Sequence, residues 1–164
     1  MTRQSLALLL AAAGCGAALG AQSSTMTASA TVVTPITVNG VAPLAFGSVF
    51  PGVNKTVQWN DPASARLQLG GDATSQLQIT FTLPASLLNG AATLPVSNYA
   101  VRVNDVNSTS GANNIPVNNG VPFTRTLVAG QLWFFVGARV QPSNTQATGS
   151  YAAPLVVTAA YTGL

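Results

Sequence analysis

A two-residue alternation of apolar and polar side chains constrains this chain more than any other feature of its sequence. In residues 76–83 the alternation places one set of apolar side chains on a single face: Leu77, Ile79, Phe81 and Leu83. A period of two matches a half-buried β-strand, whereas an amphipathic helix repeats its apolar residues every three to four positions. We therefore predict a fold built from β-strands.

Turn-forming residues divide the rest of the chain into further short strands. Pairs such as Asn39-Gly40 and Pro51-Gly52 interrupt the alternation, and these residue types favour tight turns. Besides residues 76–83, the predicted strands cover residues 26–32, 36–38, 44–50, 56–59, 65–69, 99–103, 132–140 and 155–161. Short strands with a turn signal roughly every 8 to 12 residues are typical of an antiparallel β-sandwich or barrel. We predict an all-β sandwich.

Three segments call for separate interpretations. Residues 132–140 are apolar on both faces, which predicts a buried strand in the middle of a sheet. Residues 85–88 form the only plausible helical turn, because Asn89 and Gly90 follow at once. Residues 104–121 are rich in Asn, Ser and Gly, so we predict a long surface loop with room for one short hairpin.

The composition limits the partners of this protein. Only 5% of the 164 residues are charged, with six Lys and Arg against three Asp and Glu. The surface must therefore consist largely of Thr, Ser, Asn and Gln, which suits a protein that packs against copies of itself or works outside the cell. The cationic residues are spaced singly along the sequence. Nucleic-acid binding needs clustered Lys and Arg, so we expect no nucleic-acid partner.

The N-terminal residues have the pattern of an export signal. Arg3 precedes a nearly unbroken apolar stretch over residues 6–19, which ends in small residues. This is the pattern of a signal peptide, and the stretch is too short to span a bilayer. We predict a signal peptide over residues 1–20, removed by cleavage after Gly20 or Ala21. Residues 21–164 would then be a single secreted or cell-surface domain with an N-terminal extension over about residues 22–34, and no transmembrane segment.

The single cysteine, Cys15, has two interpretations. In the first, it is a small apolar residue that is discarded with the signal peptide. The mature chain would then have no cysteine, and no disulfide would brace the fold. In the second, Ala12-Ala13-Gly14-Cys15 resembles a lipoprotein cleavage box, although Ala12 stands where Leu is usual. Cys15 would then become a lipidated N-terminus.

The residue inventory leaves little for catalysis. The chain has no histidine and no glutamate, and its only carboxylates are Asp61, Asp72 and Asp105. General acid-base catalysis and zinc sites depend on His, Cys or paired carboxylates, and calcium sites need clustered carboxylates. We therefore expect no enzyme activity, no cofactor and no metal. Trp59 and Trp133 could stack on sugars, with core packing as the other interpretation.

Several segments together resemble a known family. Residues 30–38 followed by 44–49, residues 79–84, and residues 136–161 look like the opening, middle and end of a bacterial secreted pilin-like domain of unknown function. That domain is similar to fimbrial major subunits and to spore-coat-protein-U-type and chaperone-usher pilins. The resemblance implies an immunoglobulin-like sandwich and a non-enzymatic subunit of a fimbria-like, adhesive assembly at the cell surface.

The C-terminal segment extends this resemblance. Gly149 is followed twelve residues later by the near-terminal Tyr161, a spacing similar to that in chaperone-usher pilins. The resemblance implies polymerisation by β-strand donation, with a periplasmic chaperone and an usher as partners besides other copies of the chain. The donor side chains would be Met26, Ala28, Ala30 and Val32. The acceptor side would be formed by Gly149, Tyr151, Leu155, Val157, Ala159 and Tyr161.

Two alternatives remain open from the sequence. Residues 30–38 could be the first strand of the domain itself, in which case the sandwich would be complete without a donor. The protein would then be a monomeric secreted binding module for glycans or surface adhesion, with Trp133 or Trp59 as the contact. The three residues after Tyr161 and the lack of the disulfide found in type 1 pilins are departures from the pilin pattern.

Overall fold

The structure consists of strands and connecting loops. The computed structural model describes residues 26–163. The strands are β1 (Thr37–Ala42), β2 (Lys55–Val57), β3 (Ala65–Gly70), β4 (Gln76–Thr82), β5 (Ser86–Asn89), β6 (Ala92–Asn104), β7 (Asn113–Ile115), β8 (Phe123–Thr126), β9 (Gln131–Val140) and β10 (Val156–Tyr161). Residues 26–163 contain no helix, and so none that is long and apolar enough to cross a membrane.

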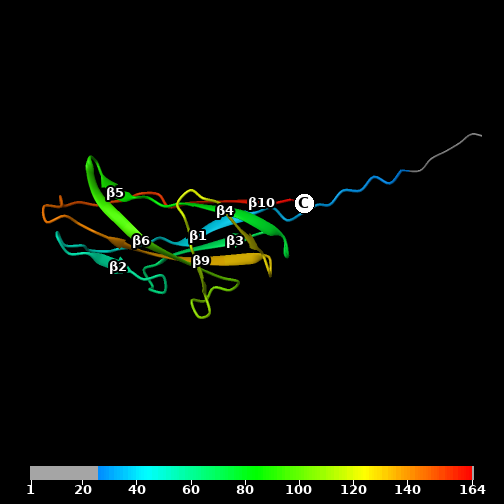
Figure 1. The fold of residues 1–164 in the computed structure, drawn as a ribbon, viewed down its shortest axis with the longest axis horizontal. Coiled ribbons are helices and arrows are strands. Elements are labelled where there is room, and N and C mark those ends of the chain that lie inside the picture. Colours follow the sequence, from blue (N-terminus) through cyan, green and yellow to red (C-terminus); the bar gives the residue numbers. More distant parts are fainter. Residues whose placement is uncertain (1–25, 164) are drawn as a thin grey trace, which may run out of the picture. The chain divides into compact units, whose positions relative to one another are not determined.

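Two antiparallel sheets carry these strands, which confirms the predicted all-β class. The larger sheet has the order β1-β3-β9-β6-β5, with β2 also paired to β9 and β7 to β6. The smaller sheet has the order β10-β4-β8 (Figure 1). The first and last strands of the fold, β1 and β10, therefore stand at the edges of different sheets.

The β9 strand is the centre of the larger sheet, as its apolar sequence predicts. Phe134 pairs with Leu67 of β3 on one side and with Val103 of β6 on the other. Phe134 and Phe135 point to opposite faces, and each is at most 1% exposed. A strand with neighbours on both sides and cover on both faces has no need for polar alternation.

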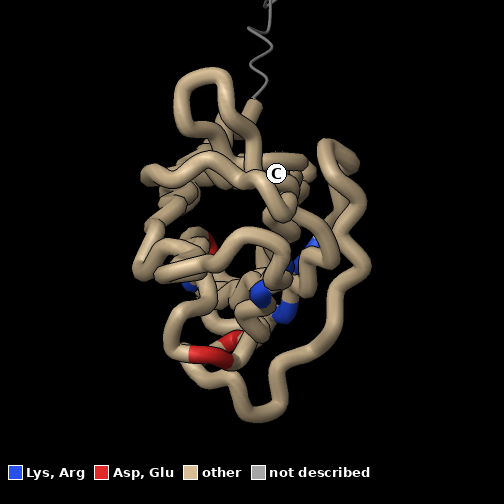
Figure 2. The backbone as a smooth tube through the Cα atoms, turned by 90° about the vertical axis from the view of Figure 1, so that its left-hand side faces the viewer, with Lys and Arg blue, Asp and Glu red and all other residues tan. Residues whose placement is uncertain are grey.

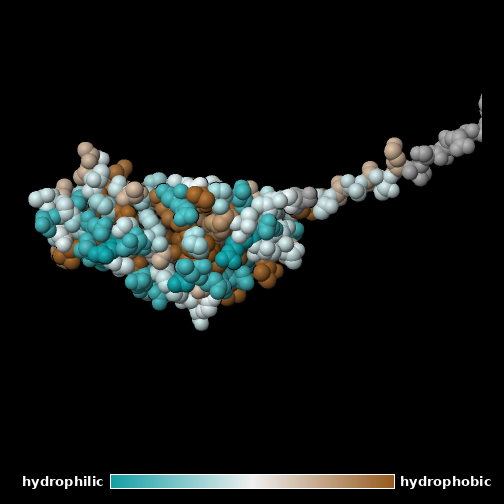
Figure 3. All heavy atoms as spheres, in the orientation of Figure 1, coloured by the Kyte–Doolittle hydropathy of each residue, from teal (hydrophilic) through white to brown (hydrophobic). Residues whose placement is uncertain are grey.

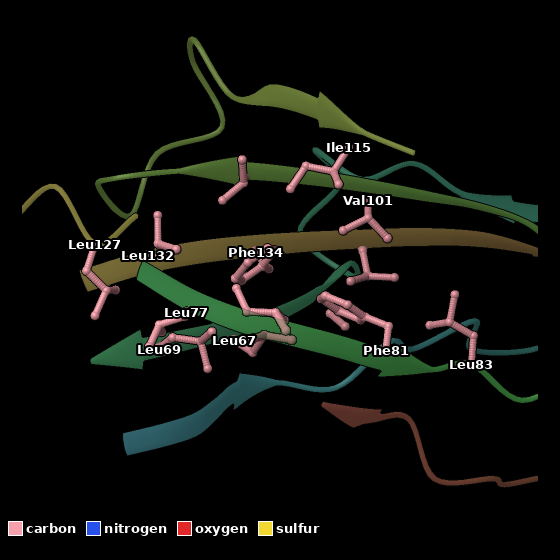
Figure 4. Packing of buried hydrophobic residues seen from close by; sticks show 14 residues of the cluster. Leu67, Leu69, Leu77, Phe81, Leu83, Val101, Ile115, Leu127, Leu132 and Phe134 are labelled. Carbon is pink, nitrogen blue, oxygen red and sulfur yellow. The ribbon is translucent and has the colours of Figure 1, made fainter. Parts of the chain in front are cut away.

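The main hydrophobic core lies between the two sheets. Inward side chains of β3, β6 and β9 face those of β4 (Figure 4). The rings of Phe81 and Phe134 meet edge to face, with centroids 5.4 Å apart, and Phe123 stacks on Phe81 at 6.0 Å. Burial of a side chain of this size contributes about 1.5–3 kcal/mol. These contacts hold the small sheet against the large one.

A second, smaller core cluster corrects the prediction for residues 44–50. This segment is not a strand, although Phe46 is buried in the cluster with Val57, Leu94 and Val140. Gly47 has a φ of 62°, which breaks an extended conformation. Residues 44–50 therefore form an irregular segment that buries the side chain of Phe46 in this cluster.

Other boundaries also differ from the sequence prediction. Residues 26–36 contain no strand, and the predicted helical turn at residues 85–88 is wrong, because β5 occupies it. The predicted loop contains β7, paired with β6. The polar strand β8 escaped prediction because only Phe123 has the expected large apolar side chain.

Contacts divide the chain into two units, Met1–Thr31 and Val32–Leu164. Of the first unit, the structure describes only residues 26–31, which have no regular secondary structure. The predicted signal peptide and Cys15 lie outside the described residues.

Candidate functional site

Among the strand edges that lack a partner within residues 26–163, those of β1 and β10 lie near each other. The β1 strand pairs only with β3, and β10 pairs only with β4. The two strands approach each other without pairing. Each therefore presents a row of main-chain N–H and C=O groups that no described strand satisfies, and such an edge is a template for another strand.

A cavity of about 650 Å³ lies between these two edges. Val38, Gly40 and Ala42 of β1 line one side, and Ala153 and residues 155–157 line the other. Leu67 and Tyr99 also contribute to the lining. The inner surface of the cavity is mostly apolar, because inward positions of both strands face it.

A second cavity, of about 800 Å³, continues the first along the molecule. Residues 43–51 and 146–153 form much of its lining. The two cavities share five residues: Pro43, Leu44, Phe46, Leu87 and Ala153. We call the two together the edge groove. Figure 3 shows apolar atoms gathered in the middle of one face of the molecule, bordered by hydrophilic ones.

The structure brings four of the six predicted acceptor residues to the edge groove. Leu155 and Val157 line the first cavity, and Gly149 and Tyr151 line the second. The remaining two, Ala159 and Tyr161, lie on β10 beyond the groove. The sequence did not predict the β1 side of the groove. The inward positions of this short, exposed strand have the same pattern as those of any ordinary edge strand.

Tyr161 anchors the chain where it enters β1. Its hydroxyl donates a hydrogen bond to the carbonyl oxygen of Thr34 at 2.6 Å and accepts one from the backbone N–H of Asp72, also at 2.6 Å. A side chain added at Gly71 would meet this hydroxyl. Tyr161 is thus a fixed point between the N-terminal segment, β10 and the turn between β3 and β4.

The opposite end of the groove is fixed by contacts with β5. Leu88 and Ala152 exchange two backbone hydrogen bonds, of 2.9 and 3.0 Å. Gly149 has a φ of 146°, and a Cβ there would collide with the side-chain amide of Asn89. Only glycine combines this backbone angle with so close an approach.

The predicted donor residues have no strand in the structure. Met26, Ala28 and Ala30 belong to the first unit, and Val32 begins the second. All four are exposed, with 92% of Met26 and 96% of Val32 accessible.

Tyr99 lies in a partly desolvated part of the groove. Its hydroxyl donates a 2.7 Å hydrogen bond to the carbonyl oxygen of Pro84. Desolvation by burial raises the pKa of Tyr99 from 10.0 to about 12, because the charged form loses hydration. The hydroxyl of Tyr99 is therefore partly shielded from water at this point of the groove.

Two of the three carboxylates within residues 26–163 accept hydrogen bonds in their own turns. Asp61 accepts a 2.7 Å hydrogen bond from the backbone N–H of Gln58, and Asp72 accepts one of 3.2 Å from the hydroxyl of Ser75. In residues 26–163 no three His, Cys, Asp or Glu side chains come together. The groove can therefore bind a ligand through main-chain hydrogen bonds and apolar subsites.

Comparison with known proteins places the chain in a family. No curated protein matches this sequence. The model of a family described as a domain of unknown function, DUF4402, matches residues 22–161. The match covers the N-terminal extension as well as every strand. It extends over most of the chain, so this protein belongs to the DUF4402 family.

Proposed function

We propose that this protein is an exported, non-enzymatic structural subunit that polymerises by β-strand donation. The edge groove of one copy accepts the N-terminal extension of the next. The observation that carries the proposal is the groove itself, an apolar channel bounded by two strand edges without partners. An added strand would satisfy both edges with main-chain hydrogen bonds, and its alternate side chains would fill the apolar subsites.

The N-terminal extension has the side chains that such a strand needs. Met26, Ala28, Ala30 and Val32 alternate with hydroxyl-bearing or small residues, so in an extended conformation they share one face. Residues 22–33 would span roughly 40 Å when extended. The wall of the groove from Val38 to Pro51 is of comparable chain length.

The hydrogen bond between Tyr161 and Thr34 favours a second copy as the donor. It holds the chain at the end of β10, beyond the groove. To enter its own groove, the extension would have to reverse direction next to Pro35, where the carbonyl of Thr34 is already engaged. The extension of another copy needs no such reversal.

The wider setting belongs to the same proposal. An export signal over residues 1–20 would bring the chain through the periplasm to the cell surface, where the filament would act in adhesion. The finer fold would be immunoglobulin-like with one strand missing. A chaperone and an usher would cover the groove before assembly, because an exposed apolar strand edge promotes unwanted pairing.

The direct test is deletion of residues 22–32 from the mature chain. We expect filaments in negative-stain electron microscopy from the intact mature chain and monomers from the deletion variant. The matched point variants are Ala28→Asp and Thr27→Asp, because only the former places a charge on the groove-facing side of the donor. Filaments that persist after the deletion, or an equal effect of both variants, would overturn the proposal.

The acceptor side has its own test at Gly40. A Cβ added there has no heavy atom within 4 Å, so Gly40→Leu would fill the groove without disturbing the fold. Asn39→Leu adds the same side chain to the other face of β1 as a control. We expect only Gly40→Leu to block polymerisation. A chain that stays monomeric with an intact groove and extension would instead favour the monomeric binding module.

A further inference from the structure

Three arginines that are far apart in the sequence lie on the outer face of the larger sheet, Arg66 and Arg102 on one side of the segment 57–59 that crosses β9 at Gly137, and Arg139 on the other. Arg66 of β3 and Arg102 of β6 both pair with Phe135 of β9, one from each side. Arg139 lies on the same face four residues further along β9. The strand spacing places Arg66 and Arg102 about 10 Å apart, and Arg139 about 13 Å along the strand from Phe135. We call this surface the arginine face.

The arginine face is lined with polar atoms that lack hydrogen-bond partners. Six buried side-chain polar atoms of the described residues have no partner, and five of them lie here: Nε of Arg66, Arg102 and Arg139, Nε1 of Trp133 and Oγ of Ser97. Four of these five belong to groups that can only donate. The face therefore presents mainly hydrogen-bond donors, which are complementary to a ligand rich in acceptor oxygens.

The charge of the face is not neutralised by the carboxylates in the turns. Three of the five Lys and Arg residues within residues 26–163 lie on it, and of the three carboxylates in this range Asp61 and Asp72 accept hydrogen bonds in their own turns. Figure 2 shows how few charged positions the backbone carries, with none around the C-terminus. Guanidinium groups bind carboxylate and sulfate oxygens through paired hydrogen bonds.

The remaining side chains of the face are neutral and amphipathic. Trp59 lies against Arg102, whose guanidinium carbon is 5.1 Å from the ring centroid. The half-buried Trp133 pairs with Gln68 on one side and Asn104 on the other. Such a surface combines aromatic rings, amides and sparse positive charge. This is the complement of a sugar chain that carries occasional acidic groups.

We propose that the arginine face binds an anionic polysaccharide, one with carboxylate or sulfate groups spaced along a chain of sugars. A nucleic acid fits less well, because its phosphate at every nucleotide calls for a dense cluster of cations. Arg66 lines the first cavity of the edge groove, whereas Arg102, Arg139 and Trp133 do not line the groove, so substitutions at Arg102 and Arg139 test this proposal separately from strand donation. In a filament the face would repeat with each subunit, and the binding would gain from multivalency.

The test measures binding of the mature chain to immobilised polygalacturonate, dextran sulfate and neutral dextran. We expect binding to at least one of the two acidic polymers, weakening as salt is added, and none to dextran. Arg102→Gln and Arg139→Gln should each weaken it by about tenfold or more. Arg125→Gln is the matched control, because it removes the same charge from β8 of the other sheet.

The outcomes separate this proposal from others. Equal loss with Arg125→Gln would mean attraction by net charge alone and would overturn the proposal, as would tighter binding to an oligothymidylate than to either acidic polymer. If the chain bound neutral dextran as tightly as the acidic polymers, the arginines would have no role in binding and the proposal would be overturned. Electron microscopy of Arg102→Gln should show unchanged filaments, so failure of glycan binding and failure of polymerisation are read separately.

Discussion

At the scale of single residues, tyrosine hydroxyls hold the ends of the groove. Tyr161 links Thr34 to Asp72 at one end. Near the other, the hydroxyl of Tyr151 donates to the carbonyl oxygen of Ala147 at 2.8 Å and accepts from the amide of Gln146 at 2.7 Å. Each makes two hydrogen bonds, but only Tyr161 touches the segment that leads to the N-terminus.

This difference gives a paired prediction. Tyr161→Phe and Tyr151→Phe each lose two hydrogen bonds, so both should lower the free energy of unfolding by about 1–2 kcal/mol. Only Tyr161→Phe should also free the chain around Thr34. Limited proteolysis should then cut the segment before β1 faster in Tyr161→Phe than in Tyr151→Phe, and equal cutting rates would contradict the anchoring role.

Tyr99 predicts a pH dependence. Its pKa is raised to about 12 in the folded chain, so between pH 10 and 12 the unfolded chain loses a proton that the folded chain keeps. The stability that this group contributes is present below pH 10 and is lost as the pH rises through this window. Urea unfolding should show a steeper loss for the wild type than for Tyr99→Phe, whereas parallel curves would refute the assignment.

At the scale of elements, a glycine of β9 lets a loop cross the sheet. A Cβ at Gly137 would lie 2.5 Å from the backbone nitrogen of Trp59 and 2.5 Å from the carbonyl oxygen of Val57. Both are main-chain atoms next to or within β2, so neither can move aside as a flexible side chain can.

We therefore expect Gly137→Ala to destabilise the fold by about 1–3 kcal/mol or more, the range of overpacked sites. Gly40→Ala is the control, because a Cβ there meets nothing within 4 Å. Chemical denaturation of the two variants measures the difference. A stable Gly137→Ala variant would mean that residues 57–59 cross β9 at a distance large enough to admit a Cβ atom.

The sequence predicted the strands that obey the period of two and missed those that do not. The ranges 65–69, 76–83 and 132–140 correspond closely to β3, β4 and β9. Residues 44–50 alternate equally well, but Gly47 turns the backbone away from extension. The residues near β10 that line the edge groove were named from a family resemblance, while the arginine face depends on strand order, which spacing along the chain does not contain.

At the scale of the whole molecule, we expect the subunit with an open groove to be less stable than the proposed complex with a donor. A synthetic peptide of residues 22–34, added to the chain that lacks residues 22–32, should raise its unfolding midpoint. At a peptide concentration of about 100 Kd the gain in stability is about 2.7 kcal/mol. The same peptide with Ala28→Asp should give little shift, and equal shifts would exclude side-chain subsites.

The bond between Tyr161 and Thr34 also has a mechanical consequence. In a filament of the kind we propose, tension on an extension would enter its own domain at Thr34 and pass along the chain into β1 and, through the hydrogen bond to Tyr161, in part into β10. The six paired positions of β10 and β4 run side by side from Val156 to Tyr161. A pull along β10 would therefore load these rungs together in shear rather than unzip them singly, and we expect such a thread to stretch little before it fails.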